Sequence, residues 1–207
     1  MPDTTLPLQA VHEITLRALT RYAADIEEME RDVSIQEEDI DLLHLLAPGK
    51  KLLDVGSGSG RYATRLVFTG MDYTGVDYSP AMVEQARRLN PGFNFDVMSF
   101  HKLDFEDDTF DCIWACHVFG FEPKAYLPAA LAELGRVLKS GGIMVVVLPN
   151  RGESYEDMNE GVPILETFWF SSWLFEEFYQ ALEKAEFTVI HGGPRPYCGT
   201  MTFVVTK

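Results

Sequence analysis

The segment Leu52-Leu53-Asp54-Val55-Gly56-Ser57-Gly58-Ser59-Gly60 decides the fold of this chain. It begins as a short apolar strand that ends in an acid, and it continues through three glycines that alternate with serines. Glycine adopts positive φ angles without strain and lets a ligand approach the backbone closely. A helix that starts after such a turn points its free N–H groups at whatever occupies the loop. The segment therefore predicts a nucleotide-type ligand site at the carboxyl end of a strand.

The spacing of the glycines separates this loop from that of dinucleotide-binding proteins, whose fingerprint is G-x-G-x-x-G. Here the third glycine, Gly60, falls one residue early, and Arg61 stands where the dinucleotide fingerprint has glycine. Read together with Asp54, the loop has the pattern D-x-G-x-G-x-G. This pattern resembles motif I of the class I S-adenosylmethionine-dependent methyltransferases, and the resemblance implies S-adenosylmethionine as the cofactor.

A second segment, residues 73–82 with the sequence YTGVDYSPAM, supports the same family. It is a β-rich run that ends in Asp77, followed by Ser79 as a helix N-cap and Pro80 at the first helical position. A carboxylate at the tip of this strand can accept hydrogen bonds from both ribose hydroxyls, as the corresponding acid does in dinucleotide folds. Asp77 therefore predicts nucleoside binding, and the phrase V-D-Y-S-P-A-M resembles the second methyltransferase signature.

Two further passages complete the resemblance. Residues 103–111 (LDFEDDTFD) and 136–142 (RVLKSGG) are similar to the family's L-P-F-x-x-x-x-F-D and R-V-L-K-P-G-G passages, and each precedes an apolar strand. The four signatures occur in the family's order over about residues 50–150. The resemblance implies an α/β, Rossmann-like three-layer sandwich with a seven-stranded, mostly parallel sheet. It also implies an antiparallel last strand beside the fifth and an N-terminal helical lid.

The pattern along the chain predicts one domain over residues 1–207. Residues 1–48 form the lid, with helices over about 8–30 and from Ser34, which forms a capping box with Glu37, to Pro48. Residues 49–150 form the cofactor-binding core, with five strand–helix alternations from Lys51 to Leu148. The substrate side covers 151–207, with a mobile loop over 149–163, a helix over about 172–185 and strands over 187–190 and 200–206.

Composition excludes several classes of protein. The net charge of −15 argues against a nucleic-acid partner, because phosphate backbones are bound by clustered Lys and Arg. We find neither a leader pattern nor an apolar run of membrane-spanning length, so we expect a cytoplasmic protein without a membrane partner. Cys112, Cys116 and Cys198 are odd in number and lack metal-site spacing, which predicts reduced thiols and no metal. The expected oligomeric state is a monomer or a homodimer.

The resemblance assigns the cofactor-binding residues position by position. The glycine loop would offer its backbone to the methionine half of the ligand, and Asp54 would help to hold the ligand's ammonium or would cap the loop's own N–H groups. Arg61 would pair with the ligand carboxylate or face solvent, and Met82 would pack on the adenine or in the core. The full predicted set is Asp54, Gly56, Ser57, Gly58, Gly60, Arg61, Asp77, Tyr78, Met82, Met98, Ser99, Phe100 and Cys116.

One position departs from the family pattern. The strand after Asn94 usually ends in an acid that binds the adenine amino group, and alignment back from Leu103 places Ser99 there, between Met98 and Phe100. The sequence therefore predicts that adenine recognition relies on backbone groups, the Ser99 hydroxyl and stacking.

The candidates for catalysis follow the fourth strand. Methyl transfer mainly requires alignment of nucleophile, carbon and sulfur, and an oxygen or nitrogen nucleophile can also need a general base. His117 is the first candidate base because its unperturbed pKa of about 6.5 suits neutral pH, and Glu122 is the alternative. Tyr22 resembles a tyrosine that some family members place over the methyl group. A wall or packing role remains open for both His117 and Tyr22.

Substrate contacts are predicted from three places: Tyr22 in the first helix, the run around Phe168–Phe175, and the segment before the final strand. The run around Phe168–Phe175 is strongly aromatic, and side chains beyond those needed for packing can line an apolar pocket. Arg195 and Tyr197 precede the final strand and can reach the same mouth to hold an anionic group. The predicted substrate set is Tyr22, His117, Phe121, Trp169, Trp173, Arg195 and Tyr197.

These observations predict a small-molecule O- or N-methyltransferase. The place after the fourth strand lacks an N-P-P-Y-like string, and the chain has no large recognition domain, which disfavours macromolecular substrates. A protein of the same fold that binds S-adenosylmethionine without transferring methyl, such as a cyclase, a carboxymethyl-forming relative or a binding-only partner, is the alternative. A nicotinamide-dependent oxidoreductase is disfavoured by Arg61 and by the absence of a Tyr-x-x-x-Lys string.

Overall fold

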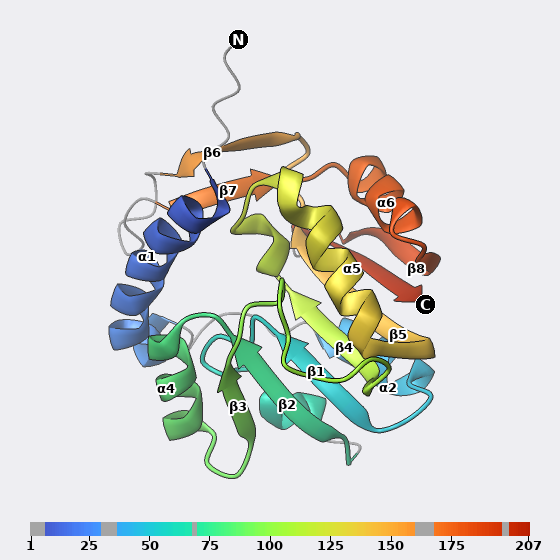
Figure 1. Cartoon of the computed structure of the whole chain (residues 1–207), viewed down its shortest axis with the longest axis horizontal. Helices are drawn as coiled ribbons and strands as arrows, with labels where there is room; N and C mark the ends of the chain where they lie inside the picture. Colours follow the sequence, from blue (N-terminus) through green and yellow to red (C-terminus); the bar gives the residue numbers. More distant parts are fainter. Residues whose placement is uncertain (1–6, 30–36, 68–69, 160–167, 196–198) are drawn as a thin grey trace.

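The computed structural model describes residues 7–29, 37–67, 70–159, 168–195 and 199–207. Seven strands of these residues form one sheet in the order β3-β2-β1-β4-β5-β9-β8 (Figure 1). The strands are β1 Lys51–Val55, β2 Asp72–Asp77, β3 Asn94–Val97, β4 Phe110–Cys116, β5 Leu138–Pro149, β8 Thr188–Arg195 and β9 Thr200–Thr206. The predicted seven-stranded sheet is confirmed.

The strand directions are those of a mostly parallel sheet. β1 to β5 are parallel, and β9 runs antiparallel to both β5 and β8. Val55 lies opposite Val76 on one side and opposite Ala115 on the other, so β1, β2 and β4 end at the same edge. The chain order reverses between β1 and β4, and ligands of open α/β sheets bind at the carboxyl ends of the strands beside such a switch point.

Helices cover both faces of the sheet. Successive residues of β5 alternate between two apolar clusters: Met144 and Val146 join α5 and α6, whereas Val145 and Val147 join α2, α3 and α4. A strand that is buried on both faces has side chains of period two in two separate cores. The helices are α1 Leu8–Met29, α2 Glu37–Leu46, α3 Ala63–Leu66, α4 Pro80–Leu89, α5 Leu127–Val137 and α6 Phe175–Lys184.

The N-cap expected at Ser79 is present, whereas the expected capping box of the second helix lies outside the described residues at Ser34. The Ser79 hydroxyl accepts a hydrogen bond from the Met82 backbone N–H at 3.4 Å, and Pro80 occupies the first position of α4. This cap fixes the start of α4 directly after the tip of β2.

Four predictions about the elements were wrong. Residues 155–159 of the expected loop form strand β6 (Tyr155–Asn159), which pairs antiparallel with β7 (Phe168–Ser172) in a separate ribbon beside α1 (Figure 1). α6 begins at Phe175 because Ser172 belongs to β7. No helix joins β3 to β4, whose connection over 98–109 is fully described. β5 begins at Leu138, within the segment 136–142 that was expected to precede the strand.

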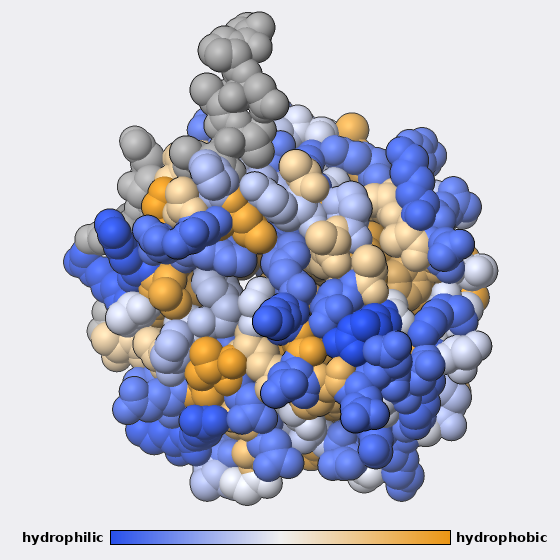
Figure 2. All heavy atoms as spheres, in the orientation of Figure 1, coloured by the Kyte–Doolittle hydropathy of each residue, from blue (hydrophilic) through white to orange (hydrophobic). Residues whose placement is uncertain are grey.

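The exterior agrees with the composition. The face seen in Figure 2 is mostly hydrophilic, with apolar side chains in scattered patches. Among the described helices, none has both the length and the apolar character that crossing a membrane requires.

We expect Gly60→Ala to destabilise the fold by roughly 2–4 kcal/mol, because two costs add. Gly60 has a φ of +75°, and an added Cβ would lie 2.6 Å from Cζ of Phe95. Gly152 also has a φ of +75°, but an added Cβ there meets nothing within 4 Å, so Gly152→Ala should cost only about 1 kcal/mol. Urea unfolding measures both values, and equal losses would contradict close packing behind the glycine loop.

Candidate cofactor and substrate site

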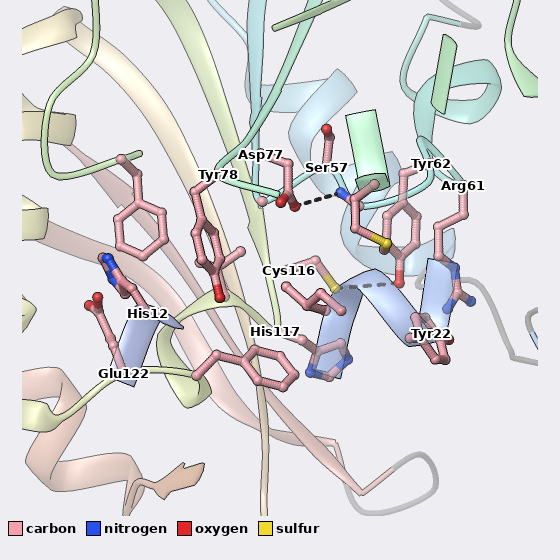
Figure 3. Close-up of a pocket in the computed structure, with 17 residues that line it drawn as sticks. His12, Tyr22, Ser57, Arg61, Tyr62, Asp77, Tyr78, Cys116, His117 and Glu122 are labelled. Carbon is pink, nitrogen blue, oxygen red and sulfur yellow. Dashed lines mark hydrogen bonds between the residues drawn. The ribbon is translucent and has the colours of Figure 1, made fainter. Parts of the chain in front are cut away.

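A pocket of about 260 Å³ opens at the carboxyl ends of β1, β2 and β4, beneath α1 (Figure 3). It lies where the topology predicts a ligand site. Thirteen residues predicted for the site line it, from the glycine loop, the tip of β2, the loop after β4 and α1. They are Tyr22, Gly56, Ser57, Gly58, Arg61, Asp77, Tyr78, Met82, Phe100, Cys116, His117, Phe121 and Glu122.

Asp77 joins the glycine loop to the start of α4. Its Oδ1 accepts a hydrogen bond from the Ser79 N–H at 2.8 Å, and its Oδ2 accepts one from the Gly58 N–H at 3.0 Å. Burial raises the pKa of Asp77 to about 6, and the two N–H donors oppose that rise. Each carboxylate oxygen still has acceptor capacity for a ligand hydroxyl in the pocket that Asp77 lines.

The glycine loop is held against β2 by its backbone. Ser57 donates its N–H to the carbonyl of Val76 at 3.0 Å, and Gly56 and Gly58 have φ angles of +65° and +54°. The Ser57 hydroxyl is buried and has no hydrogen-bond partner among the described residues. Because buried polar groups in proteins are almost always paired, this hydroxyl is available to a ligand.

Asp54 lies behind the loop and does not line the pocket. Its Oδ2 accepts a hydrogen bond from the Tyr73 hydroxyl at 2.6 Å, and both residues are buried. Burial raises the pKa of Asp54 to about 7, the Tyr73 hydrogen bond opposes the rise, and the charge of Asp77 adds to it. In this structure the Asp54 carboxylate therefore links β1 to β2 through Tyr73.

The loop after β4 carries His117, whose backbone is left-handed with a φ of +61°. The backbone N–H of His117 donates to the Val147 carbonyl at 2.8 Å. The ring Nδ1 of His117 is buried without a partner among the described residues. Burial, with the nearby Arg61 charge, lowers the pKa of His117 to about 4, so its imidazole is neutral at pH 7. Beside it, the Cys116 thiol donates to the Tyr62 hydroxyl at 3.4 Å, and burial raises its pKa to about 12.

On the other side of Asp77, Tyr78, His12 and Glu122 face the pocket (Figure 3). The ring centroids of His12 and Tyr78 lie 5.1 Å apart. Nε2 of His101 lies 2.5 Å from Oε2 of Glu122. Burial lowers the pKa of His12, and its electrostatic interaction with His101 lowers it further. Burial raises the pKa of Glu122, and His101 opposes that rise.

His12, His101 and Glu122 are also a set of potential metal ligands, because their ligand atoms lie within 4.8 Å of one another. Donor atoms around a tetrahedral zinc ion are about 3.4 Å apart, since each metal–ligand bond is about 2.1 Å long. The contact of 2.5 Å between His101 and Glu122 is a hydrogen bond, and it is shorter than this ligand–ligand separation.

Three predicted substrate residues do not line the pocket, and those predictions are corrected. Trp173 belongs to the core beside α6, where its Nε1 donates to the Phe119 carbonyl at 3.0 Å. Trp169 is buried in the β6–β7 ribbon and donates to the Ser171 hydroxyl. Arg195 pairs with Glu38 and Asp39 of α2 at 2.6 Å each. Tyr197 lies outside the described residues.

Besides Asp54, three predicted cofactor residues lie outside the pocket lining. Gly60 packs behind the loop against Phe95, and Met98 and Ser99 stop short of the pocket. The Ser99 hydroxyl accepts a hydrogen bond from the His101 N–H at 3.3 Å, so it serves the turn after β3.

Four lining residues were not predicted from the sequence: His12, Leu19, Tyr62 and Val118. His12, Leu19 and the predicted Tyr22 lie on α1 at intervals of seven and three residues, which place side chains near one face of a helix. That spacing could have shown which face of the lid covers the pocket. Tyr62 and Val118 directly follow predicted site residues, but no signal in the sequence marks them.

Comparison with known proteins agrees with this geometry. Residues 53–146 match the family model described as "Methyltransferase domain". A demethylmenaquinone methyltransferase of Beutenbergia cavernae is 32% identical over 99 residues, which are 48% of this chain and 40% of that protein. The chain thus matches about two-fifths of that relative's length. Over residues 53–146 the chain is thus similar to a methyltransferase domain.

Two solved structures share the fold. A 1,6-didemethyltoxoflavin-N1-methyltransferase of Burkholderia thailandensis, with bound 1,6-didemethyltoxoflavin and S-adenosylhomocysteine, has a TM-score of 0.79 at 18% identity and covers 100% of this chain and 93% of its own. The [4+2]-cyclase SpnF has a TM-score of 0.64 at 21% identity and covers 83% of this chain and 81% of its own. At these identities the likeness concerns the fold alone.

We expect Asp54→Asn to change how stability depends on pH. Burial raises the pKa of Asp54 to about 7 from its ordinary value of 3.8, so between pH 4 and pH 7 the folded state holds a proton that the unfolded state has lost. This group therefore makes the protein less stable as the pH rises through that window, by at most about 1.4 kcal/mol per pH unit.

Urea unfolding between pH 4.5 and pH 7 should show a shallower decline for Asp54→Asn than for the wild type. The exposed Asp72→Asn on the neighbouring strand is the control and should follow the wild type. Parallel curves for Asp54→Asn and the wild type would contradict the buried, proton-holding state of Asp54.

Proposed function

We propose that this chain transfers a methyl group from S-adenosylmethionine to an oxygen or nitrogen atom of a small, partly apolar molecule. The observation that carries the proposal is Asp77, a buried carboxylate at the tip of β2 that lines the pocket and holds the glycine loop through the Gly58 N–H. The match of residues 53–146 to the methyltransferase-domain family supports it.

The described residues fit this cofactor. Asp77 can accept hydrogen bonds from the ribose hydroxyls, and the Ser57 hydroxyl is a buried group without a partner beside it. Arg61 is the only Arg or Lys among the described lining residues, and we propose that it pairs with the ligand carboxylate. Met82 and Tyr78 present apolar surface to the nucleoside.

The chemistry requires positioning more than proton transfer. S-Adenosylmethionine supplies an activated methyl group, which leaves sulfur as the acceptor's lone pair bonds to carbon and yields S-adenosylhomocysteine. Tyr22 and His117 both line the pocket (Figure 3). Because its imidazole is neutral at pH 7, His117 can accept a hydrogen bond from an N–H or O–H of the acceptor at Nδ1. We propose that this contact aligns the lone pair of the acceptor.

We propose a small acceptor because the pocket volume is only about 260 Å³. Tyr22 and Phe121 line it with aromatic rings, and α1, which carries Tyr22, packs against β7. Aromatic surface with few polar groups suits a flat or partly apolar molecule.

A second function remains as the alternative, namely a reaction or a binding role that keeps S-adenosylmethionine without methyl transfer. The fold shared with the [4+2]-cyclase SpnF supports this alternative function, because a fold alone does not determine the chemistry of its site. Formation of S-adenosylhomocysteine distinguishes the two functions.

The proposal is tested by incubating the protein with S-adenosylmethionine and a panel of small phenols, amines and carboxylic acids. Methyl transfer predicts acceptor-dependent S-adenosylhomocysteine, together with a product heavier by one methylene by mass spectrometry. Cofactor binding without turnover across the panel would favour the alternative.

Asp77→Ala should weaken S-adenosylhomocysteine binding by about 1–3 kcal/mol, because ligand hydroxyls would lose their buried acceptor. The shift of the thermal unfolding midpoint with ligand concentration measures the affinity. Asp72→Ala, at the exposed start of the same strand, is the control. An unchanged affinity in Asp77→Ala would remove Asp77 from the ribose.

His117→Ala should lower kcat by about 10²-fold if the imidazole receives the acceptor's proton or holds its N–H or O–H. Because the pKa of His117 is about 4, the rate should show no step from this residue between pH 6 and pH 8. Steady-state rates across that range provide the measurement. A full-rate variant would leave alignment by the remaining pocket as the main catalytic device.

A further inference from the structure

Glu122 is a buried acid with one unused oxygen. The residue is only 3% exposed, it lines the pocket, and its Oε1 has no hydrogen-bond partner among the described residues. An ionised carboxylate can only accept hydrogen bonds, and burying it without a partner is costly. Oε1 of Glu122 can therefore accept a hydrogen bond from a donor group of a ligand in the pocket.

The position of Glu122 is fixed from two sides. His101 holds Oε2 through Nε2 at 2.5 Å, and the Ser171 hydroxyl donates to the Glu122 carbonyl at 2.6 Å. His101 comes from the turn after β3 and holds the Glu122 carboxylate, whereas Ser171 comes from β7 and holds the Glu122 main chain. Such support is typical of a group that must meet a ligand in one geometry.

The pocket is divided by Asp77, and Glu122 lies on the side away from Arg61 (Figure 3). If Asp77 binds the ribose and Arg61 the ligand carboxylate, the methionine half occupies the Arg61 side. The base then points toward Tyr78, His12 and Glu122.

The Glu122 side of the pocket suits a flat base. Tyr78 and Phe100 line it, the His12 ring lies 5.1 Å from that of Tyr78, and the His101 ring lies 4.9 Å from that of Phe100. Aromatic rings at such distances offer surfaces on which a purine can stack. A base in this slot can reach Oε1 of Glu122, a buried acceptor that has no partner among the described residues.

We propose that Glu122, positioned by His101, accepts a hydrogen bond from the exocyclic amino group of the adenine of S-adenosylmethionine. The inference rests on the proposed function, because it takes that cofactor as the ligand. It replaces the catalytic role predicted for Glu122 and assigns adenine recognition to the loop after β4. Ser99, the position predicted for that task, lies outside the pocket lining and supports the His101 backbone.

The proposal predicts selectivity for an amino group over a carbonyl oxygen. S-Inosylhomocysteine differs from S-adenosylhomocysteine in carrying oxygen in place of that amino group, so its oxygen would face Oε1 of Glu122. The wild type should bind S-adenosylhomocysteine at least about 10-fold more tightly than S-inosylhomocysteine, since a site built for a donor rejects an acceptor.

Glu122→Gln should reduce this preference by about 10-fold or more. The glutamine oxygen can keep the His101 hydrogen bond, which leaves its NH₂ group facing the base and favours the oxygen of S-inosylhomocysteine. His101→Ala, which frees the carboxylate, should reduce the preference in the same direction. Glu84→Gln removes the same charge from the exposed face of α4 and should preserve the wild-type ratio.

Calorimetric titration of each protein with both ligands, in buffer containing EDTA to remove divalent cations, gives the ratios. A wild type that binds both ligands equally would overturn the proposal even if Glu122→Gln failed to fold. An unchanged ratio in a folded Glu122→Gln would also overturn it. A wild type that binds neither ligand would contradict the proposed function itself, which separates the two failures.

Discussion

The hydrogen bonds of Asp77 are the interaction on which the site depends. One carboxylate holds the Gly58 N–H of the glycine loop and the Ser79 N–H at the start of α4, so it links the segments that follow β1 and β2. Because β1 and β2 are parallel and end together, a short acid at the tip of β2 can reach the loop after β1. Burial raises the pKa of Asp77 to about 6 because it disfavours the charged carboxylate. Further hydrogen-bond donors from a ligand would offset that cost.

The fold could be predicted because its signals are local. The strand, glycine loop and capped helix around Gly56 and Asp77 are specified by residues within a few positions of each other, and the structure has them as predicted. The β6–β7 ribbon was missed because its strands are short and each depends on pairing with the other. A pairing of that kind depends on a distant partner strand and is only weakly visible in its own sequence.

The site was predictable where the main chain leads directly to it and unpredictable where packing decides. Asp77, His117 and Glu122 follow strand ends and line the pocket. Trp173 and Arg195 were misplaced because an aromatic or charged residue near the site in sequence can turn into the core or pair with another helix, as Arg195 does with Asp39. His12 was overlooked because only the packing of α1 over the sheet brings it to the pocket, whose wall combines residues from segments far apart in the chain.

The most direct test of the account is calorimetric titration of the wild-type protein with S-adenosylhomocysteine, with NAD as the comparison ligand. The geometry of the glycine loop, Asp77 and Arg61 predicts one site per chain with micromolar affinity for S-adenosylhomocysteine and no heat from NAD. Binding of NAD, or no binding of S-adenosylhomocysteine, would contradict the assignment of the pocket as an S-adenosylmethionine site.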